Sequence, residues 1–442
     1  MNKKLFYLAA LALSVSFASC SDDDNKDIPT PEPEYPTGSI VWPEDTVVTL
    51  TDHFLVDVNQ SLYIEPGVKI IADNGDKKPE IVVLGNLYCL GTAEKPVTFT
   101  VADKYKTDRF SRMWGGIICG YDSKEVVLDH AILEYGGAQT SEESLSWKKQ
   151  LFKTEEVGEG VPAFHFCNTN GSFVITNCVF RNNAEDHIYI TGGKSIVANN
   201  QFYSNGYDGG EAINYKSGCQ ADIAYNLVYD ANTNGLKLSN SGLSPDIAAS
   251  HLVIYNNTIV NSGWRRPKTK GGSIWLESNI HADLYNNLVY DCRYAMKHKT
   301  DDVESSNCIL APTYYFASTQ NGADQMMADV EDGILNNTGD IVSATPGAND
   351  PKFVSFQQTA GMNVNYGVEK DDTKKGNAPA TFSTSWDFHL QAGSPALTGG
   401  KTDFTRIYAS GITFEGLKDM EGVTATYNSP APAAYFGVYG TK

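Results

Sequence analysis

The feature that most constrains the fold of this chain is a recurring turn with an asparagine at its corner. The turn occurs six times, in segments such as ITNCVF at 175–180 and YNNLVY at 285–290. The six asparagines are Asn177, Asn200, Asn226, Asn257, Asn287 and Asn307. By subtraction, their spacings are 23, 26, 31, 30 and 20 residues. Repeats of this length indicate a solenoid, in which each repeat forms one coil and neighbouring coils share a core.

Apolar residues within each repeat alternate over short runs and do not follow helical spacing. Val126 and Leu128 are one example, and the runs are broken by Gly, Asn and Asp. This pattern predicts short strands joined by tight turns, so the expected fold class is all-β. We expect stacked parallel coils over residues 39–310. Residues 311–442 should form an irregular β-rich cap that completes the solenoid and covers its open end, with a short helix at 323–335.

The repeated asparagine has an expected structural role in such a stack. Asparagine tolerates the left-handed backbone conformation of a sharp corner. Its side-chain amide can also donate to and accept from the asparagine of the next coil, which would form a ladder. Asp129, in the earlier segment LDHAIL, is expected to end this ladder. We therefore interpret these asparagines as structural and not as ligand-binding residues.

Several longer segments resemble the right-handed parallel β-helix superfamily, the pectate-lyase-like fold, in its bacterial lipoprotein form. They are IEPGVKIIA at 64–72, IVVLGNLYCLGTAEKPVTFT at 81–100, MWGGIICG at 113–120, DPKF at 350–353 and DFHLQAGSPALTGG at 387–400. The resemblance implies the fold. It does not imply one activity, because this fold serves lyases, hydrolases and adhesins alike.

The first nineteen residues have the pattern of a secretory signal peptide. Lys3 and Lys4 precede an apolar stretch that is too short to span a membrane. The segment FASC ends at Cys20 and resembles a bacterial lipobox, which implies cleavage before Cys20 and acylation of that residue. The following SDDD resembles the surface-export signal of Bacteroidetes lipoproteins. Residues 20–38 are then an acidic, proline-rich tether, and the expected location is the cell surface, on the outer membrane.

Charge and cysteine spacing exclude some partners. The chain has 34 basic and 53 acidic residues, a net charge of −19. Such an acidic protein lacks the basic surface that nucleic-acid binding requires. Seven cysteines follow Cys20 without CxxC spacing, so we expect no zinc site, and most are expected to be buried thiols. No cofactor is expected, Ca²⁺ has only a weak signal at 208–211, and a monomer is the expected state.

The asparagine corners set the alignment of the strands that follow them. With Ile188, Ile213, Leu236, Ile274 and Met296 aligned as inward residues, alternation sends the next residue of each strand outward. The outward column is Tyr189, Asn214, Lys237, Trp275 and Lys297. His187 and Lys216 are expected to flank it, and the loop with Arg265 and Arg266 is expected to overhang it.

This outward face is the candidate functional site. In the β-helix superfamily, polysaccharides lie along such a face. Aromatic rings can stack on sugars, and Lys and Arg can pair with uronate or sulfate groups. The sequence therefore predicts binding of polysaccharide, with a preference for acidic chains. The alternatives are a solvated strand face in a structural lipoprotein, or an adhesin.

An enzymatic alternative is a polysaccharide lyase. Its chemistry needs a base beside the uronate and a cation that stabilises the enolate. Lys237 or Lys297 is the candidate base, and Arg265 or Arg266 is the candidate cation. A glycoside hydrolase would instead need two carboxylates about 5 to 9 Å apart across the scissile bond. The column itself contains no such pair, although Glu185, Asp186, Asp208 and Glu211 are nearby in sequence.

Overall fold

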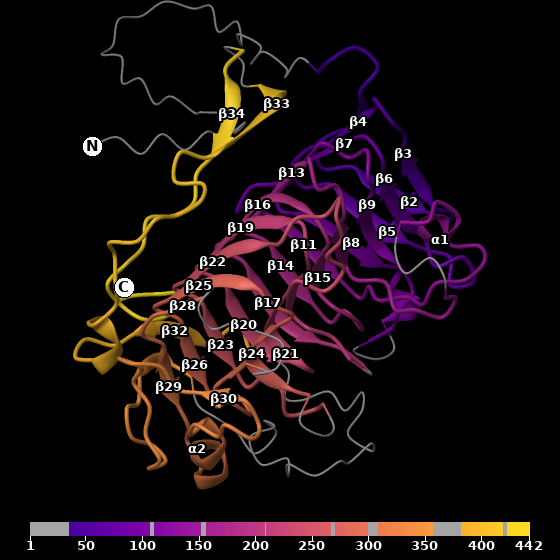
Figure 1. Cartoon of the computed structure of the whole chain (residues 1–442). Helices are drawn as coiled ribbons and strands as arrows, with labels where there is room; N and C mark the ends of the chain where they lie inside the picture. Colours follow the sequence, from indigo (N-terminus) through magenta and orange to yellow (C-terminus); the bar gives the residue numbers. More distant parts are fainter. Residues whose placement is uncertain are drawn as a thin grey trace, which may run out of the picture.

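The chain winds into a stack of β-strand coils along a single axis (Figure 1). The computed structural model describes residues 35–106, 110–151, 156–207, 209–266, 270–298, 308–356, 382–418 and 422–442. Three sheets of ten strands each run the length of the stack, and each coil gives one strand to every sheet. This arrangement confirms the prediction of an all-β solenoid. The signal peptide, Cys20, most of the tether and Asn307 lie outside the described residues, so the lipid anchor and the surface location stay predictions.

Sheet A contains only parallel pairs. Its strands are β1 (Ile40–Trp42), β4 (Ser61–Ile64), β7 (Asn86–Leu90), β10 (Glu125–Asp129), β13 (Ser172–Thr176), β16 (Gly193–Ala198), β19 (Cys219–Ala224), β22 (His251–Tyr255), β25 (His281–Tyr285) and β28 (Ile309–Leu310). The ladder asparagines follow the strands of this sheet, so its end forms the corner that the sequence repeat marks.

Sheet B begins directly after that corner and is also parallel throughout. Its strands are β2 (Val47–Leu50), β5 (Lys69–Ala72), β8 (Val97–Val101), β11 (Ala131–Glu134), β14 (Val179–Arg181), β17 (Gln201–Asn205), β20 (Leu227–Ala231), β23 (Thr258–Val260), β26 (Leu288–Tyr290) and β29 (Tyr314–Phe316). Its outer face carries a row of tyrosines that includes Tyr203 and Tyr229.

Sheet C completes each coil and carries the predicted outward column. Its strands are β3 (Phe54–Val56), β6 (Glu80–Val83), β9 (Gly116–Cys119), β12 (Phe164–Phe166), β15 (Ile188–Ile190), β18 (Ile213–Tyr215), β21 (Asn234–Ser239), β24 (Gly272–Glu277), β27 (Met296–His298) and β30 (Ile334–Leu335). All pairs are parallel except the last, where β30 runs antiparallel to β27 and ends the sheet. The solenoid therefore extends slightly past residue 310.

The core is a continuous apolar column inside the coils, built from the inward residues of all three sheets. Ile188, Ile213 and Leu236 are fully buried at neighbouring positions of sheet C, as the alternation predicts. The cysteines are free thiols, and six of the seven in the described residues are buried. This confirms the expectation of buried thiols. Among the described residues, no helix is long and apolar enough to cross a membrane.

The asparagine ladder is present at four successive corners. The side-chain amide of Asn200 donates to Asn226 at 3.0 Å. Asn226 donates to Asn257, and Asn257 to Asn287, each at 2.9 Å. All four asparagines are buried, so each of these hydrogen bonds replaces one that the side-chain amide would otherwise make with water.

The prediction that the ladder asparagines themselves adopt the left-handed conformation is wrong by one residue. Positive φ occurs at the preceding positions, which are Asn199, Tyr225, Asn256 and Asn286. Left-handed backbone turns the chain at that residue, and the next side chain then points inward to the ladder.

Asn177 therefore occupies the left-handed corner position, and it is not one of the inward asparagines that form the ladder. Its φ is 57°, and its amide donates to Asp129 at 3.0 Å. In that coil, Cys178 occupies the inward position that an asparagine fills in the later coils. Its backbone N–H donates to Asn200 Oδ1 at 2.9 Å. The expected ladder therefore begins one coil later, at Asn200.

The insertion at 138–160 covers the outer face of sheet C over the first coils. Leu145, at the start of α1 (Leu145–Lys148), and Leu151 pack on the outward residues Val82 and Ile118. The Ser146 N–H and hydroxyl donate to the buried carboxylate of Glu80 at 2.8 and 2.9 Å. The outer face of sheet C is therefore closed at this end and opens only beyond β12.

The C-terminal region differs from the expected cap. Helix α2 (Gln320–Met326) and β30 do cover the end of the stack, but the helix is shorter than predicted because Ile334 pairs with β27 as a strand. The chain then runs back along the flank of the stack toward its first coils (Figure 1). This return path includes β31 (Phe353–Ser355), β32 (Asp387–Leu390), the 3-10 turn Pro395–Leu397, and the hairpin of β33 (Ile412–Lys418) and β34 (Thr424–Tyr427).

Aromatic packing explains the return path of the C-terminal residues. Their rings cover the tyrosines on the outer face of sheet B, and Tyr203 stacks on Phe382 at 3.6 Å between ring centroids. Farther along, the backbone N–H groups of Ile407 and Tyr408 donate to Asp222 at 3.0 and 2.7 Å. Tyr63 in the first coils donates to Gly416 O at 2.6 Å. Most of the C-terminal region thus packs along the side of the solenoid and does not cover its end.

Candidate functional site

The predicted outward column of sheet C is confirmed residue by residue. Strand pairing aligns Tyr189 with Asn214, Asn214 with Lys237, Lys237 with Trp275, and Trp275 with Lys297. These side chains therefore share one face over five consecutive coils. His165 precedes Tyr189 in the same column.

A polar pocket of about 250 Å³ lies on this face at its closed end. Tyr189, Asn214 and Lys237 form its floor, because each comes from the outward position of its strand. Turns from neighbouring coils form its walls. The lining residues are Gly160, Pro162, Glu185, Asp186, Tyr189, Gly210, Glu211, Asn214, Lys216 and Lys237. Gly160 ends the insertion and Pro162 follows it closely, so the segment that closes the first coils also bounds the pocket.

Two buried carboxyl groups, Asp186 and Glu211, lie together at one wall. The Glu211 N–H donates to Asp186 Oδ1 at 2.7 Å, and Asn214 Nδ2 donates to Asp186 Oδ2 at 2.8 Å. Burial raises the pKa of Asp186 well above its usual value, and the adjacent Glu211 carboxylate raises it further. Burial and the adjacent carboxylate thus both favour the protonated form of Asp186.

Two lysines face these carboxyl groups. Burial lowers the pKa of Lys216, and the Lys237 ammonium lowers it further. Burial acts in the same direction on Lys237, but Glu211 and Glu277 outweigh it and raise the pKa of that lysine. Lys237 forms an ion pair with Glu277 at 3.2 Å, and Lys216 lies over the Tyr189 ring at 5.6 Å from its centroid.

The pocket also holds a buried acceptor. Asn214 is only 3% exposed, and its Oδ1 makes no hydrogen bond within the described part of the chain. A buried amide oxygen without a partner costs free energy that a donor from a ligand or a water can recover. The pocket thus offers acceptors at Asn214 and Glu211, donors at both lysines, and an aromatic ring at Tyr189.

The far end of the column is a compact aromatic and cationic group. Lys297 Nζ lies 4.5 Å from the Trp275 ring centroid and 4.6 Å from that of Tyr294. Burial lowers the pKa of Lys297 to about 8, and the nearby Arg293 acts in the same direction. Trp275 is half-buried on this face, so it does not present the open platform that a strand on the solvent side would suggest.

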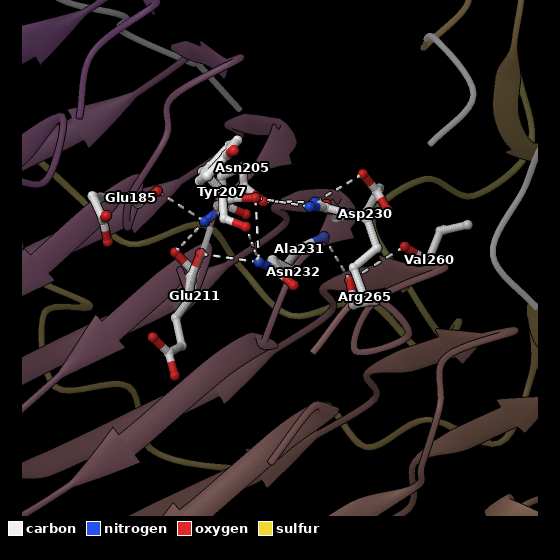
Figure 2. Close-up of polar contacts among 12 residues, drawn as sticks. Glu185, Asn205, Tyr207, Glu211, Asp230, Ala231, Asn232, Val260 and Arg265 are labelled. Atoms are coloured by element: carbon white, nitrogen blue, oxygen red, sulfur yellow. Dashed lines mark hydrogen bonds and ion pairs between the residues drawn. The ribbon is translucent and has the colours of Figure 1, made fainter. Parts of the chain in front are cut away.

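Arg265 does not reach the face. It is 1% exposed, and its guanidinium pairs with Asp230 at 3.2 Å (Figure 2). It also donates to Asn205 O at 2.6 Å and to Gly206 O at 2.7 Å. The placement does not support the expected contact with a ligand, because a polar loop residue next to a buried carboxylate turns inward to satisfy it. The Arg266 guanidinium, in contrast, lies against Gly209, next to the pocket wall at Gly210.

Arg265 instead supports the turn that carries Glu211. Figure 2 shows Asn205, Asn232 and Arg265 around the same turn. Asn205 Nδ2 donates to Glu211 O at 2.8 Å and to Glu185 O at 3.1 Å. Asn232 Nδ2 donates to Gly206 O at 3.2 Å. This buried network fixes the wall of the pocket from behind.

His187 also departs from its expected position. It is fully buried between Phe180 and Phe202, and Asn183 Nδ2 lies 3.0 Å from its Nδ1. Burial lowers its pKa to about 3. His187 lies directly before β15, where the chain is still entering the strand, so the strand alternation does not extend to it.

A second and larger cleft separates sheet B from the C-terminal segment. Its volume is about 880 Å³, and its walls include Tyr203, Trp386 and His389. Its charged groups are paired: Arg181 with Glu134 at 2.7 Å, and Asp387 with Lys442, which lies outside the cleft lining. The sheet C pocket is the stronger candidate because it concentrates buried groups with shifted pKa values at the end of an aligned column.

The fold and this site define a parallel β-helix protein, whose fold often binds or processes polysaccharides. Residues 164–310, about a third of the chain, match the family model described as "Right handed beta helix region". The matched span begins at β12 and ends at β28, so it contains the whole open part of the column. No curated protein and no solved structure matches the chain.

Proposed function

We propose that this protein binds polysaccharide along the outer face of sheet C, with one sugar unit seated in the pocket above Tyr189, Asn214 and Lys237. The observation that carries the proposal is the meeting of buried Asp186, Glu211 and Lys216 around a floor that includes Lys237 and an unsatisfied amide oxygen. Sugar hydroxyls are both donors and acceptors, which suits a pocket with both kinds of group. The Tyr189 ring adds an apolar surface for the sugar face.

A preference for acidic chains belongs to the same proposal. The column has one lysine at its middle, Lys237, and one at its far end, Lys297, and Arg266 lies beside the pocket wall. Glu211 and Glu277 offset part of this charge, while the raised pKa of Asp186 reduces its negative contribution. Uronate groups can pair with the lysines, and a chain with esterified uronates cannot.

Affinity electrophoresis against polygalacturonate, alginate and chondroitin sulfate tests this proposal. We expect at least one of these polymers to retard the protein, and methyl-esterified polygalacturonate to retard it less than the free acid. Tyr189→Ala should weaken the retardation about tenfold or more, since an aromatic contact and the pocket floor are lost together. Trp275→Ala should have a smaller effect.

Tyr121→Ala is the matched control, because Tyr121 is 60% exposed and does not line the pocket. It should bind like the unmodified protein. Equal retardation of the Tyr189→Ala and Tyr121→Ala variants on every polymer would place binding elsewhere.

A polysaccharide lyase is the second candidate function, favoured by one observation. The pKa of about 8 at Lys297 allows an appreciable neutral fraction near neutral pH, as a general base requires. In this reaction the base removes the proton beside the uronate carboxyl group, and the glycosidic oxygen leaves from the neighbouring carbon. The product carries an unsaturated uronate end that absorbs in the ultraviolet.

If this candidate is correct, ultraviolet absorbance should grow on one of the acidic polymers. The rate should rise as pH increases through about 8, since the neutral lysine is the active form. Lys297→Gln should abolish the rate, whereas Lys352→Gln, an exposed lysine, should not change it. Silence on the whole panel would eliminate the lyase for these substrates and leave the binding proposal intact.

A further inference from the structure

A group of two histidines and one aspartate lies on the outer face of sheet A, away from the sheet C pocket. His251 begins β22 and His281 begins β25, and strand pairing places them directly side by side. Asp283 follows two residues after His281, so it points to the same face. Among the described residues, these three are the one group of at least three His, Cys, Asp or Glu side chains whose ligand atoms are close enough together to hold a metal ion.

The potential ligand atoms lie close together. His251 Nε2 is 3.1 Å from Asp283 Oδ2, and His281 Nε2 is 3.6 Å from Asp283 Oδ1. All three ligand atoms lie within 4.8 Å of one another. Two atoms that are each about 2.1 Å from a tetrahedral Zn²⁺ are about 3.4 Å apart, so the two histidine–aspartate distances, which go to different carboxylate oxygens, are close to the edge of such a site.

The two imidazoles need only a small adjustment to share an ion. Their rings are stacked, with centroids 3.9 Å apart and planes at 11°. Stacked rings direct their lone pairs in parallel, so ion binding requires the rings to fan apart. Both side chains are about two-fifths exposed, at 38% and 43%, so this rotation is not opposed by core packing.

Asp283 is held in place for this role. It is 8% exposed, and its Oδ1 accepts a hydrogen bond from the Ile309 N–H at 3.2 Å. Asp222 occupies the same column two coils earlier, where it is paired through Val253. The C-terminal segment satisfies Asp222 through the backbone N–H groups of Ile407 and Tyr408. Asp283 is instead contacted by the two histidines.

We propose that His251, His281 and Asp283 bind a divalent first-row transition metal ion, such as Zn²⁺, that joins two neighbouring coils on the outer face of sheet A. Imidazole and carboxylate are ligands for such ions, and three protein ligands leave a fourth position for water or a ligand. Ca²⁺ and Mg²⁺ are disfavoured, because they prefer an all-oxygen shell. This site is independent of the proposed polysaccharide pocket.

Calorimetric titration with Zn²⁺ tests the proposal, using the full chain without a histidine tag and after treatment with a chelator. We expect one ion per chain. His281→Asn and Asp283→Asn should each weaken binding at least tenfold. Titration with Co²⁺ gives a second readout, since its visible absorption bands should appear with the unmodified protein and be lost in both variants.

His389→Gln is the matched control, because His389 forms a histidine–aspartate pair with Asp387 at 2.7 Å without a second histidine. It should bind Zn²⁺ like the unmodified protein. Circular dichroism of each variant without metal checks that the fold is retained, and His251→Asn replaces any variant that fails this check. Equal affinity in the unmodified protein and the His281→Asn variant would overturn the proposal, as would a lack of binding in the unmodified protein.

Discussion

Arg265→Leu is expected to lower the free energy of unfolding by about 3–5 kcal/mol. The substitution leaves the Asp230 carboxylate buried without its cation, at 1% exposure. It also removes the donors to Asn205 O and Gly206 O. Urea unfolding followed by far-ultraviolet circular dichroism measures the change.

Two comparisons isolate the cause of that loss. Arg181→Leu removes a partly exposed arginine from the buried Glu134 carboxylate, which keeps its contacts with the Thr100 hydroxyl and Lys106, so the loss should be smaller than for Arg265→Leu. The double variant Arg265→Leu with Asp230→Leu should regain much of the stability, because no unpaired charge remains. If the single Arg265→Leu variant has the same free energy of unfolding as the unmodified protein, the buried network behind the pocket does not stabilise the fold as proposed.

Asn226→Ala is the second substitution with a large expected effect, a loss of about 3–5 kcal/mol. The Asn226 amide donates to Val197 O and to Asn257 Oδ1, both at 2.9 Å. Its Oδ1 accepts from the Asn200 side chain at 3.0 Å and from the Asn200 backbone at 3.2 Å. Each buried group left without a partner costs about 1–3 kcal/mol, and partial relaxation keeps the sum toward the lower end.

The adjacent corner offers a matched control for the ladder. Asn199 is exposed, and its φ is 61°, a conformation that glycine adopts without strain. Asn199→Gly should therefore change the free energy of unfolding by no more than about 0.5 kcal/mol. If Asn226→Ala were as stable as Asn199→Gly, the hydrogen bonds of the asparagine ladder would not have the stabilising role assigned to them. The same urea denaturation measures both.

The sequence predicted the strand register of sheet C correctly, because the asparagine corners mark each coil and alternation then fixes which side chains point outward. Tyr189, Asn214, Lys237, Trp275 and Lys297 follow from these two rules alone. The rules could not predict the position of residues in turns. Arg265 turns inward to Asp230. Asn177 proved to be a corner residue followed by Cys178, because a single asparagine in the repeat does not reveal whether it occupies the corner or the next, inward position.

The pocket itself could be anticipated only in part. Its floor comes from strands, but Asp186 and Glu211 come from turns of neighbouring coils, and their meeting depends on how each turn folds over the face. The proposed metal-binding group could not be anticipated for a similar reason, because His251 and His281 are 30 residues apart and no short motif joins them. Their alignment becomes visible only after the coils are in register. The path of the C-terminal region depends on aromatic contacts with residues far away in sequence.

The crystal structure of a complex with whichever acidic polysaccharide fragment retards the protein most would test the central claim directly. The account predicts electron density for a sugar above Tyr189, with contacts to Asn214 Oδ1 and to Lys237, and with the chain continuing toward Trp275. Density in the cleft between Tyr203 and Trp386, with the sheet C pocket empty, would contradict it.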